Sequence, residues 1–308
     1  MKTALITLSA EGTRLLSPLT WRLPEARLFI HDSVWDDSIR CEPVRNETTT
    51  RQDSNRREAD LHDPGRQDDS TRSDSELEAP AAERFTKISD LTAALFPVCR
   101  GLVYAAPCGV VVRALAPLVK SKFEDPAVVV LDAGGRWAVS LLSGHEGGAN
   151  DLAIRVANLT GAEPVITTTT EALKSVIIGI GCRRRTPAER IVAAIREALA
   201  EAGIALAEVR LLASADLKVD EAGLLAAAET LGVPIRFLPA AEIRASTREF
   251  SHSDFVAEKV NLPAVAEPAA LLAGRRTRFI CRKKTTNGIT IALTREGFSW
   301  SESAPAVR

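Results

Sequence analysis

Residues 141–151, with the sequence LLSGHEGGAND, lead from an apolar strand through a glycine-rich turn into the start of a helix. Strand, glycine turn and helix in direct succession are typical of an α/β fold. Gly144, Gly147 and Gly148 let backbone N–H groups approach a ligand, and the helix beginning at Ala149 directs its positive end to the same place. The stretch therefore predicts an anion-binding turn.

The side chains of this turn also suggest chemistry. An unperturbed imidazole titrates near neutral pH, so His145 is a candidate general base, with a purely structural hydrogen bond as the alternative. Ser143 and Asn150 supply further hydrogen-bonding groups and fit helix caps as well as ligands. The turn lacks the G-x-S-x-G pattern, so a serine nucleophile elbow is not indicated.

Composition narrows the class of protein. A chain of 308 residues, 45% of them apolar, is long enough for two domains, which we expect at 1–172 and 173–308. Lys and Arg number 39 against 40 Asp and Glu, a balance that argues against a nucleic-acid partner. Five cysteines without a C-x-x-C pair indicate neither a disulfide framework nor a zinc site. No apolar run approaches the ~20 residues of a membrane helix. We expect a cytoplasmic protein without a membrane partner.

Strand and helix patterns alternate along both halves. The first half predicts strands at 4–8, 27–30, 102–106, 127–131, 137–142 and 164–166, and helices at 9–16, 88–96, 110–119 and 149–159. The second half predicts strands at 176–180, 209–212, 235–238, 277–281 and 289–293, and helices at 186–202, 221–231, 255–260 and 268–272. The expected fold is α/β, with two α/β/α-type domains, mostly parallel or mixed sheets, and sites at the carboxyl ends of strands.

Three local signals refine this expectation. Thr186 followed by Glu189 predicts a capping box at a helix start. Asn287-Gly288 between two strand patterns predicts a type I′ hairpin. Residues 41–83 form a polar segment, in which Leu61 is the one sizeable aliphatic side chain between Arg45 and Glu76, so they predict a disordered insertion.

Two more strand-to-helix turns are candidate binding elements. Gly109 and Arg113 occur in CGVVVR at residues 108–113, where an arginine can pair with a carboxylate or simply lie in solvent. Gly181, Cys182, Arg183 and Arg184 occur in GIGCRR, which fits a polyanion or a solvated basic turn. Because Arg184 stands where a dinucleotide fingerprint has its third glycine, a nicotinamide-dependent dehydrogenase is disfavoured. Thr167 and Thr168 follow a strand and offer hydroxyl groups.

Together these segments resemble the cobalt-precorrin-5A hydrolase family of anaerobic cobalamin biosynthesis. The likeness is carried by residues 108–118, 125–132, 141–153, 164–168, 179–183, 255–259 and 266–271. The chain departs from the family pattern in the polar segment, in a short junction between Glu171 and Val176, and in having Glu146 where the family is usually apolar and Glu171 where it usually has aspartate.

The resemblance implies an enzyme that opens the ring-A lactone of a cobalt tetrapyrrole and releases acetaldehyde, with cobalt carried by the substrate and no further cofactor or metal. It implies His145 as the base, Ser143 as an oxyanion donor and Glu146 as a rival base. The substrate's carboxylates would be held by Gly109, Arg113, Gly144, Gly147, Gly148, Asn150, Thr167, Thr168, Gly181, Cys182, Arg183 and Arg184, so we expect the turns of the two halves to face one cleft.

A second interpretation is a non-catalytic accessory protein that binds a corrinoid intermediate, because the second half alone resembles a stand-alone protein of the aerobic cobalamin pathway. A homodimer and contacts with other enzymes of the cobalamin pathway both remain open.

Overall fold

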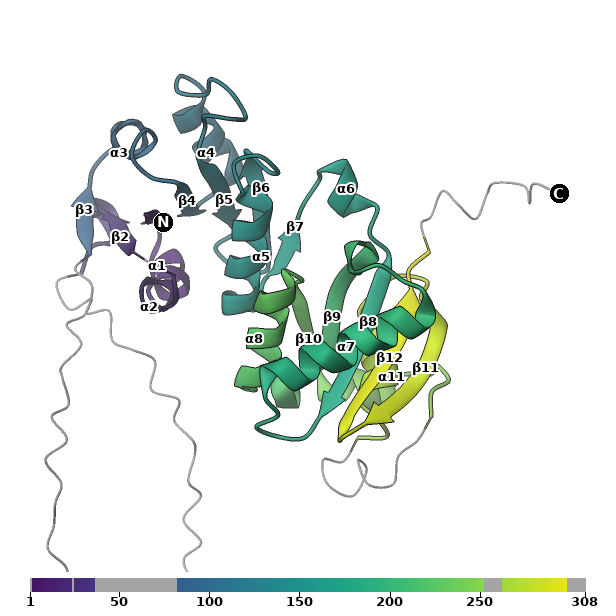
Figure 1. Cartoon of the computed structure of the whole chain (residues 1–308). Helices are drawn as coiled ribbons and strands as arrows, with labels where there is room; N and C mark the ends of the chain where they lie inside the picture. The colour runs from purple at the N-terminus through teal and green to yellow at the C-terminus, as the bar shows by residue number, and fades with distance from the viewer. Residues whose placement is uncertain (1, 24, 37–81, 252–261, 298–308) are drawn as a thin grey trace, which may run out of the picture.

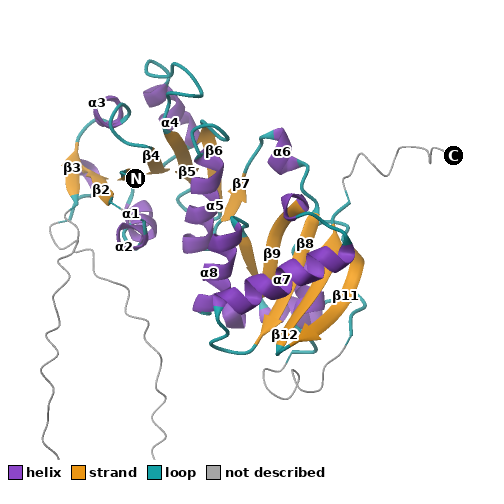
Figure 2. Cartoon of the chain, viewed as in Figure 1, coloured by secondary structure: helices purple, strands orange, loops and turns teal. Residues whose placement is uncertain are grey.

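The computed structural model describes residues 2–23, 25–36, 82–251 and 262–297, which form two α/β units with one sheet each (Figure 1). Helices cover both faces of each sheet, as the secondary-structure colouring in Figure 2 shows. The predicted fold class is confirmed. The predicted insertion lies outside the described residues apart from its last two positions, and the helix predicted at 255–260 lies outside them entirely.

The first sheet has seven strands in the order β3-β2-β1-β4-β5-β6-β7. Every neighbouring pair is parallel except β5 and β6, which are antiparallel. The strands are β1 Thr3–Thr7, β2 Ala26–His31, β3 Glu83–Phe85, β4 Gly101–Ala105, β5 Ala127–Leu131, β6 Trp137–Leu142 and β7 Glu163–Val165. Residues 132–136 are too few for a parallel crossover, so β6 returns alongside β5 as a hairpin.

Alternating apolar side chains give this sheet two buried faces. Leu5, Val103 and Val129 point to one face, which is covered by α1 Ala10–Leu16, α2 Leu19–Arg22 and α5 Ala149–Thr160. Side chains one position along, including Ile6 and Tyr104, point to the other face, which is covered by α3 Ile88–Leu95 and α4 Cys108–Leu115. Burial on both faces explains why these strands read as continuous apolar runs. Two short elements complete this half: η1 Asp32–Val34 and α6 Thr169–Ala172.

The second sheet has the order β10-β9-β8-β12-β11, with β12 antiparallel to both of its neighbours. Its strands are β8 Val176–Cys182, β9 Val209–Ala215, β10 Ile235–Leu238, β11 Arg278–Thr286 and β12 Ile289–Arg295. One face carries α7 Ala188–Ala202 and α8 Ala222–Leu231, and the other carries α9 Ala240–Ala245 and α11 Ala266–Leu272. The remaining elements are η2 Leu206–Glu208 and η3 Asp216–Lys218.

Turn predictions in this half have mixed outcomes. Asn287 and Gly288 have φ of 52° and 79°, as a type I′ hairpin requires, so that prediction is confirmed. The capping box at Thr186 is wrong. The N-cap of α7 is Pro187, without a side-chain cap, and the Thr186 hydroxyl instead donates to the carbonyl of Arg183 at 2.7 Å.

The two units meet along α5 and the amino ends of β9 and β10. The side chain of Asn158 on α5 accepts from the backbone N–H of Ile235 at 2.9 Å and donates to the carbonyl of Val233 at 3.5 Å. Glu163 at the start of β7 lies 3.7 Å from Arg210 and 3.8 Å from Arg236. No helix in the described ranges is both long enough and apolar enough to span a membrane.

Candidate functional site

The most informative candidate site is the turn between β6 and α5, residues 143–148, named here the glycine loop. Because β6 runs against β5, the loop emerges beside the start of β5, at the amino ends of the parallel strands β1, β4 and β5. A Cβ atom at Gly147 would lie 3.1 Å from the carbonyl oxygen of Asp125, just before β5. The loop thus follows the carboxyl end of β6, at the edge of the sheet opposite to the carboxyl ends of β1, β4 and β5.

Close packing explains two glycines of the loop, and backbone conformation explains the third. A Cβ at Gly147 would lie 2.3 Å from the Cβ of Ser143, and one at Gly144 would lie 2.9 Å from the Asn150 Oδ1. Gly148 has open space around it but adopts φ of 82°, which side chains disfavour. Larger residues would therefore force the loop out of this shape.

Ser143 is held in an unusual state. Its φ is 58°, in the left-handed region, and its residue exposure is 7%. Its Oγ is buried and has no hydrogen-bond partner among the described residues. A buried unpaired hydroxyl costs about 1–3 kcal/mol, and such groups concentrate at functional sites.

Asn150 has a structural role that connects three elements. Its Oδ1 accepts from the Ser140 hydroxyl of β6 at 2.9 Å, and its Nδ2 donates to the Thr168 hydroxyl before α6 at 2.9 Å. Its residue exposure is 5%, so the amide is enclosed. Asn150 and Thr168 thus hold the glycine loop against the end of β7, while Thr167 is exposed beside them.

His145 and Glu146 are the exposed side chains of the loop. The side chain of His145 forms no hydrogen bond with any other described residue. Glu146 accepts from the Lys122 ammonium at 2.5 Å, and this hydrogen bond lowers the pKa of Glu146. A carboxylate held in its charged form is a weaker base, so the pair favours His145 over Glu146 for proton abstraction.

The loop also presents backbone donors. The carbonyls of Ser143 and Gly144 accept from the N–H groups of Ala149 and Asn150 at 3.1 and 2.9 Å, which fixes the start of α5. Within the part of the chain that the structure covers, the N–H groups of Gly147 and Gly148 have no acceptor. N–H groups at the start of a helix can stabilise a carboxylate or an oxyanion.

Arg113 and Gly109 lie elsewhere in the first unit. Arg113 is exposed and donates to the carbonyl of Gly109, one turn earlier in α4, at 3.1 Å. It lines a shallow hollow between α3 and α4, together with Ile88 and Ser89. Since α4 begins at the carboxyl end of β4, Gly109 lies at the sheet edge opposite to the glycine loop.

The GIGCRR segment, named here the arginine turn, spans the last four residues of β8 and the two arginines that follow, and its first glycine serves packing. A Cβ at Gly179 would lie 1.9 Å from the carbonyl oxygen of Ala266, so this glycine lets α11 pack directly on β8. Gly181 has only ordinary contacts, the nearest at 3.5 Å to Val265. Burial raises the pKa of the Cys182 thiol, which disfavours a reactive thiolate.

The arginines of this turn lie in solvent. Arg184 pairs with Asp220 at 3.1 Å, and both side chains are more than half exposed. Arg183 is exposed and lies against Gly288 of the hairpin. Nothing in these contacts requires a bound anion.

The predicted residues therefore occupy three places. The glycine loop, Asn150 and Thr168 come together, whereas Arg113 lies between α3 and α4, and the arginine turn lies at the end of β8. In Figure 1 α6 lies above the second sheet, whereas the β11–β12 hairpin beside the end of β8 lies at the lower end of that sheet. The expected shared cleft between the turns of the two halves is wrong for this structure, because β8 leads away from α6.

Sequence reasoning missed Lys122, which reaches the glycine loop only through the antiparallel pairing of β6. The short link at residues 132–136 was the available signal, since it permits only an antiparallel return.

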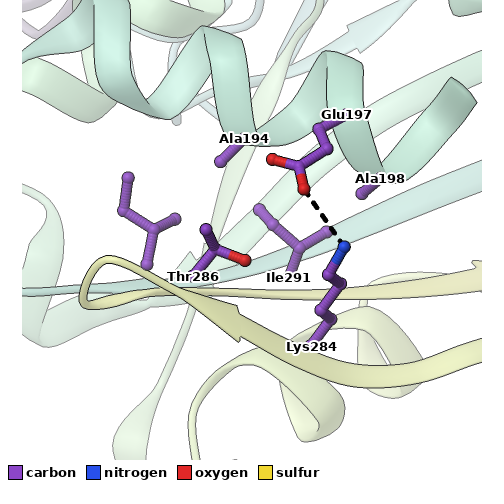
Figure 3. Close-up of a pocket in the computed structure, with 7 residues that line it drawn as sticks. Ala194, Glu197, Ala198, Lys284, Thr286 and Ile291 are labelled. Atoms are coloured by element: carbon purple, nitrogen blue, oxygen red, sulfur yellow. Dashed lines mark hydrogen bonds and ion pairs between the residues drawn. The ribbon is translucent and has the colours of Figure 1, made fainter. Parts of the chain in front are cut away.

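A further pocket under α7 is a poor binding site, because its charged groups, Lys284 and Glu197, pair with each other at 3.1 Å (Figure 3). Among the described residues, no group of three His, Cys, Asp or Glu side chains could hold a metal ion.

Fold and site define a two-unit, doubly wound α/β protein with a glycine loop suited to binding an anion. Family comparison makes this more specific. The family model described as cobalamin synthesis G N-terminal matches residues 90–171, and the one described as cobalamin synthesis G C-terminus matches residues 176–294. The chain belongs to the cobalamin synthesis G family. The first match contains the glycine loop, and the second contains the arginine turn.

Curated relatives agree with this assignment. The cobalt-precorrin-5A hydrolase of Salmonella typhimurium is 27% identical over 290 residues, covering 64% of this chain and 82% of the relative. That of Priestia megaterium is 26% identical over 302 residues, covering 66% and 80%. Protein CobE of Sinorhizobium sp. is 40% identical over 127 residues, covering 41% of this chain and 82% of the relative.

The solved structures that are similar to this chain also carry names from cobalamin biosynthesis. A CobE crystal structure is 36% identical, covers 39% of this chain and 89% of its own, and has a TM-score of 0.37. A putative cobalamin biosynthesis protein G homolog from Sulfolobus solfataricus is 16% identical, covers 96% of this chain and 97% of its own, and has a TM-score of 0.33.

Proposed function

We propose that this chain is a cobalt-precorrin-5A hydrolase of cobalamin biosynthesis, which opens the ring-A lactone of its cobalt tetrapyrrole substrate and releases acetaldehyde. The observation that carries the proposal is the match to two relatives with that name, each aligned over at least 80% of its own length. We further propose that the protein acts in the cytoplasm and that the cobalt arrives with the substrate.

The glycine loop is the part of the chain that fits this chemistry. Opening a lactone by hydrolysis requires a base for water and donors for an oxygen that gains negative charge. His145 is exposed in the loop and supplies a ring nitrogen for the water proton. The N–H groups of Gly147 and Gly148 supply donors at the start of α5.

Ser143 and Glu146 have supporting roles in this proposal. The buried Ser143 hydroxyl lies under the loop, where it can hold a water or adjust the loop once substrate is bound. Glu146 remains ionised because of Lys122 and orients that ammonium rather than taking a proton. Arg183 and Arg184 lie at the other end of the second unit, so in this structure they have no part in the chemical step.

A direct assay tests the proposal. Purified protein is incubated with cobalt-precorrin-5A, and acetaldehyde is trapped with 2,4-dinitrophenylhydrazine and quantified. We expect one acetaldehyde for each substrate consumed, with heat-inactivated protein as the control. Substrate that binds but yields no acetaldehyde would contradict hydrolysis.

That outcome would favour the second candidate, an accessory protein that binds a corrinoid intermediate. The observation in its favour is the 40% identity to protein CobE over 127 residues, the highest identity among the curated relatives described above. Activity of the whole chain decides between the two, because the glycine loop belongs to the half that the cobalamin synthesis G N-terminal model matches at residues 90–171.

A further inference from the structure

Residues 119–125, named here the Phe123 loop, are part of the connection from α4 to β5 and carry an exposed aromatic side chain beside the glycine loop. Phe123 is 74% exposed, more than any other large apolar residue that the structure describes. The other described phenylalanines are buried or half-buried. Burial of a phenylalanine ring stabilises a fold, so this position forgoes that stabilisation in the free protein.

The exposure of Phe123 is not due to a loose loop. The buried Asp125 accepts from the backbone N–H of Lys120 with both carboxylate oxygens, each at 3.1 Å. The carbonyl of Ser121 accepts from the N–H groups of Glu124 and Asp125 at 3.1 and 2.9 Å. These bonds order the backbone that carries Phe123, and a segment already ordered loses less entropy when it binds.

The Phe123 loop is joined to the glycine loop through Lys122. The Lys122 ammonium lies 4.9 Å from the centre of the Phe123 ring and 2.5 Å from the Glu146 carboxylate. On the other side, Gly147 packs closely against the backbone of Asp125. Figure 1 shows the connection from α4 to β5 at the top of the first unit. The aromatic ring and the N–H donors therefore belong to one continuous surface.

We propose that Phe123 packs against the apolar face of the substrate's macrocycle and so determines how tightly the substrate binds. This inference rests on the proposed function, in which the glycine loop engages the lactone. A flat conjugated ring with polar groups at its rim fits an exposed aromatic face next to backbone donors. Phe123 is thus a binding residue and takes no part in proton transfer.

The test compares Phe123→Ala with Trp137→Ala. Trp137 is also an exposed aromatic residue, at 44%, but it lies at the opposite end of β6 from the glycine loop. We expect Phe123→Ala to raise KM about tenfold with kcat unchanged, which is the pattern of lost binding to substrate and transition state alike. Phe123→Trp should recover most of that loss, and Trp137→Ala should leave KM within twofold. Equal KM values for the two alanine variants would overturn the inference while leaving the hydrolase activity intact.

Binding measured directly separates this inference from the proposed function. Tryptophan fluorescence of Phe123→Trp is followed during titration with cobalt-precorrin-5A, whose visible absorption quenches a nearby indole. Because the native chain already contains four tryptophans, saturable quenching beyond that of the native protein, together with weaker binding by Phe123→Ala, would support the contact even if no acetaldehyde were formed. Quenching no greater than that of the native protein while turnover continues would refute it. Unchanged melting temperatures confirm that the variants are folded.

Discussion

The glycine loop after β6 and the arginine turn at the end of β8 look alike in sequence, since each leads from an apolar strand through glycines into a helix. Their glycines make different contacts. In the glycine loop, close contacts stay within the turn and its neighbours Ser143, Asn150 and Asp125, and N–H groups are left without acceptors. In the arginine turn, Gly179 accommodates α11, and Arg184 is paired with Asp220.

This difference shows that a glycine-rich pattern predicts a close contact of the backbone but does not identify the group that it contacts. A backbone can come near a ligand, and it can equally come near another helix of the same chain. At Gly179 an added Cβ would lie 1.9 Å from the carbonyl oxygen of Ala266, so there the close neighbour is a helix of the same chain.

The largest expected effect is on catalysis. Replacing His145 by Ala should lower kcat by about 10²–10⁴-fold, because a positioned general base contributes that much. Stability should not change, since His145 is exposed. Acetaldehyde release measures kcat, and calorimetry checks the fold. His31→Ala is the matched control, because His31 is bonded to Ser33 and Thr86 away from the loop. Similar kcat values for both variants would show that His145 is not the general base.

The next effect concerns packing of α11 on the end of β8. Gly179→Ala should destabilise the protein by about 3 kcal/mol, because the new methyl group would meet the Ala266 carbonyl at 1.9 Å. Gly181→Ala, two residues later, should cost less than about 0.5 kcal/mol, since its nearest contact is 3.5 Å. Urea denaturation measures both. Equal losses in the free energy of unfolding would show that Gly179 is no more constrained by packing than Gly181.

A smaller effect tests how α11 is anchored over β8. Glu267 is buried, and although desolvation raises its pKa, hydrogen bonds from Lys283 N–H and from the Ser251 N–H and hydroxyl outweigh this and lower it. A lowered pKa means that the carboxylate stabilises the fold above its ordinary value of 4.5 and loses this contribution as the pH falls through the lowered value.

Glu267→Gln should therefore cost about 2 kcal/mol at pH 7, as expected for charge-assisted hydrogen bonds. The difference from the native protein should shrink as the pH falls below 4.5. Thermal unfolding across this pH range measures it. A difference that does not depend on pH would show that the charge of Glu267 is unimportant.

The smallest effect is expected at Arg184. Arg184→Ala should change stability by less than about 0.5 kcal/mol, because it removes an ion pair whose side chains are 66% and 52% exposed. Substrate affinity, followed by quenching of intrinsic fluorescence, should also be unchanged. A large loss of affinity would show that Arg184 contacts the substrate, and such a contact would require the two units to rearrange.

Sequence patterns located most secondary-structure elements closely. The strands Ala127–Leu131, Trp137–Leu142 and Ile235–Leu238 have the predicted bounds, and α7 ends at Ala202, followed as expected by Gly203 with φ of 66°. These features depend on neighbouring residues, so local periodicity is enough to find them. The short helices α2, α6 and α9 were not predicted, because four to six residues give too little periodic signal.

For this protein the sequence alone determined the α/β class, the strands and helices, the Asn287-Gly288 hairpin and the family likeness. Only the tertiary structure decided where the chemical groups lie: the antiparallel return of β6 moved the glycine loop to the other sheet edge, and the direction of β8 carried Arg183 and Arg184 away from it. The reason is physical, because strand pairing and helix docking are contacts between distant residues, whereas turn and helix propensities are set within a few residues of the chain.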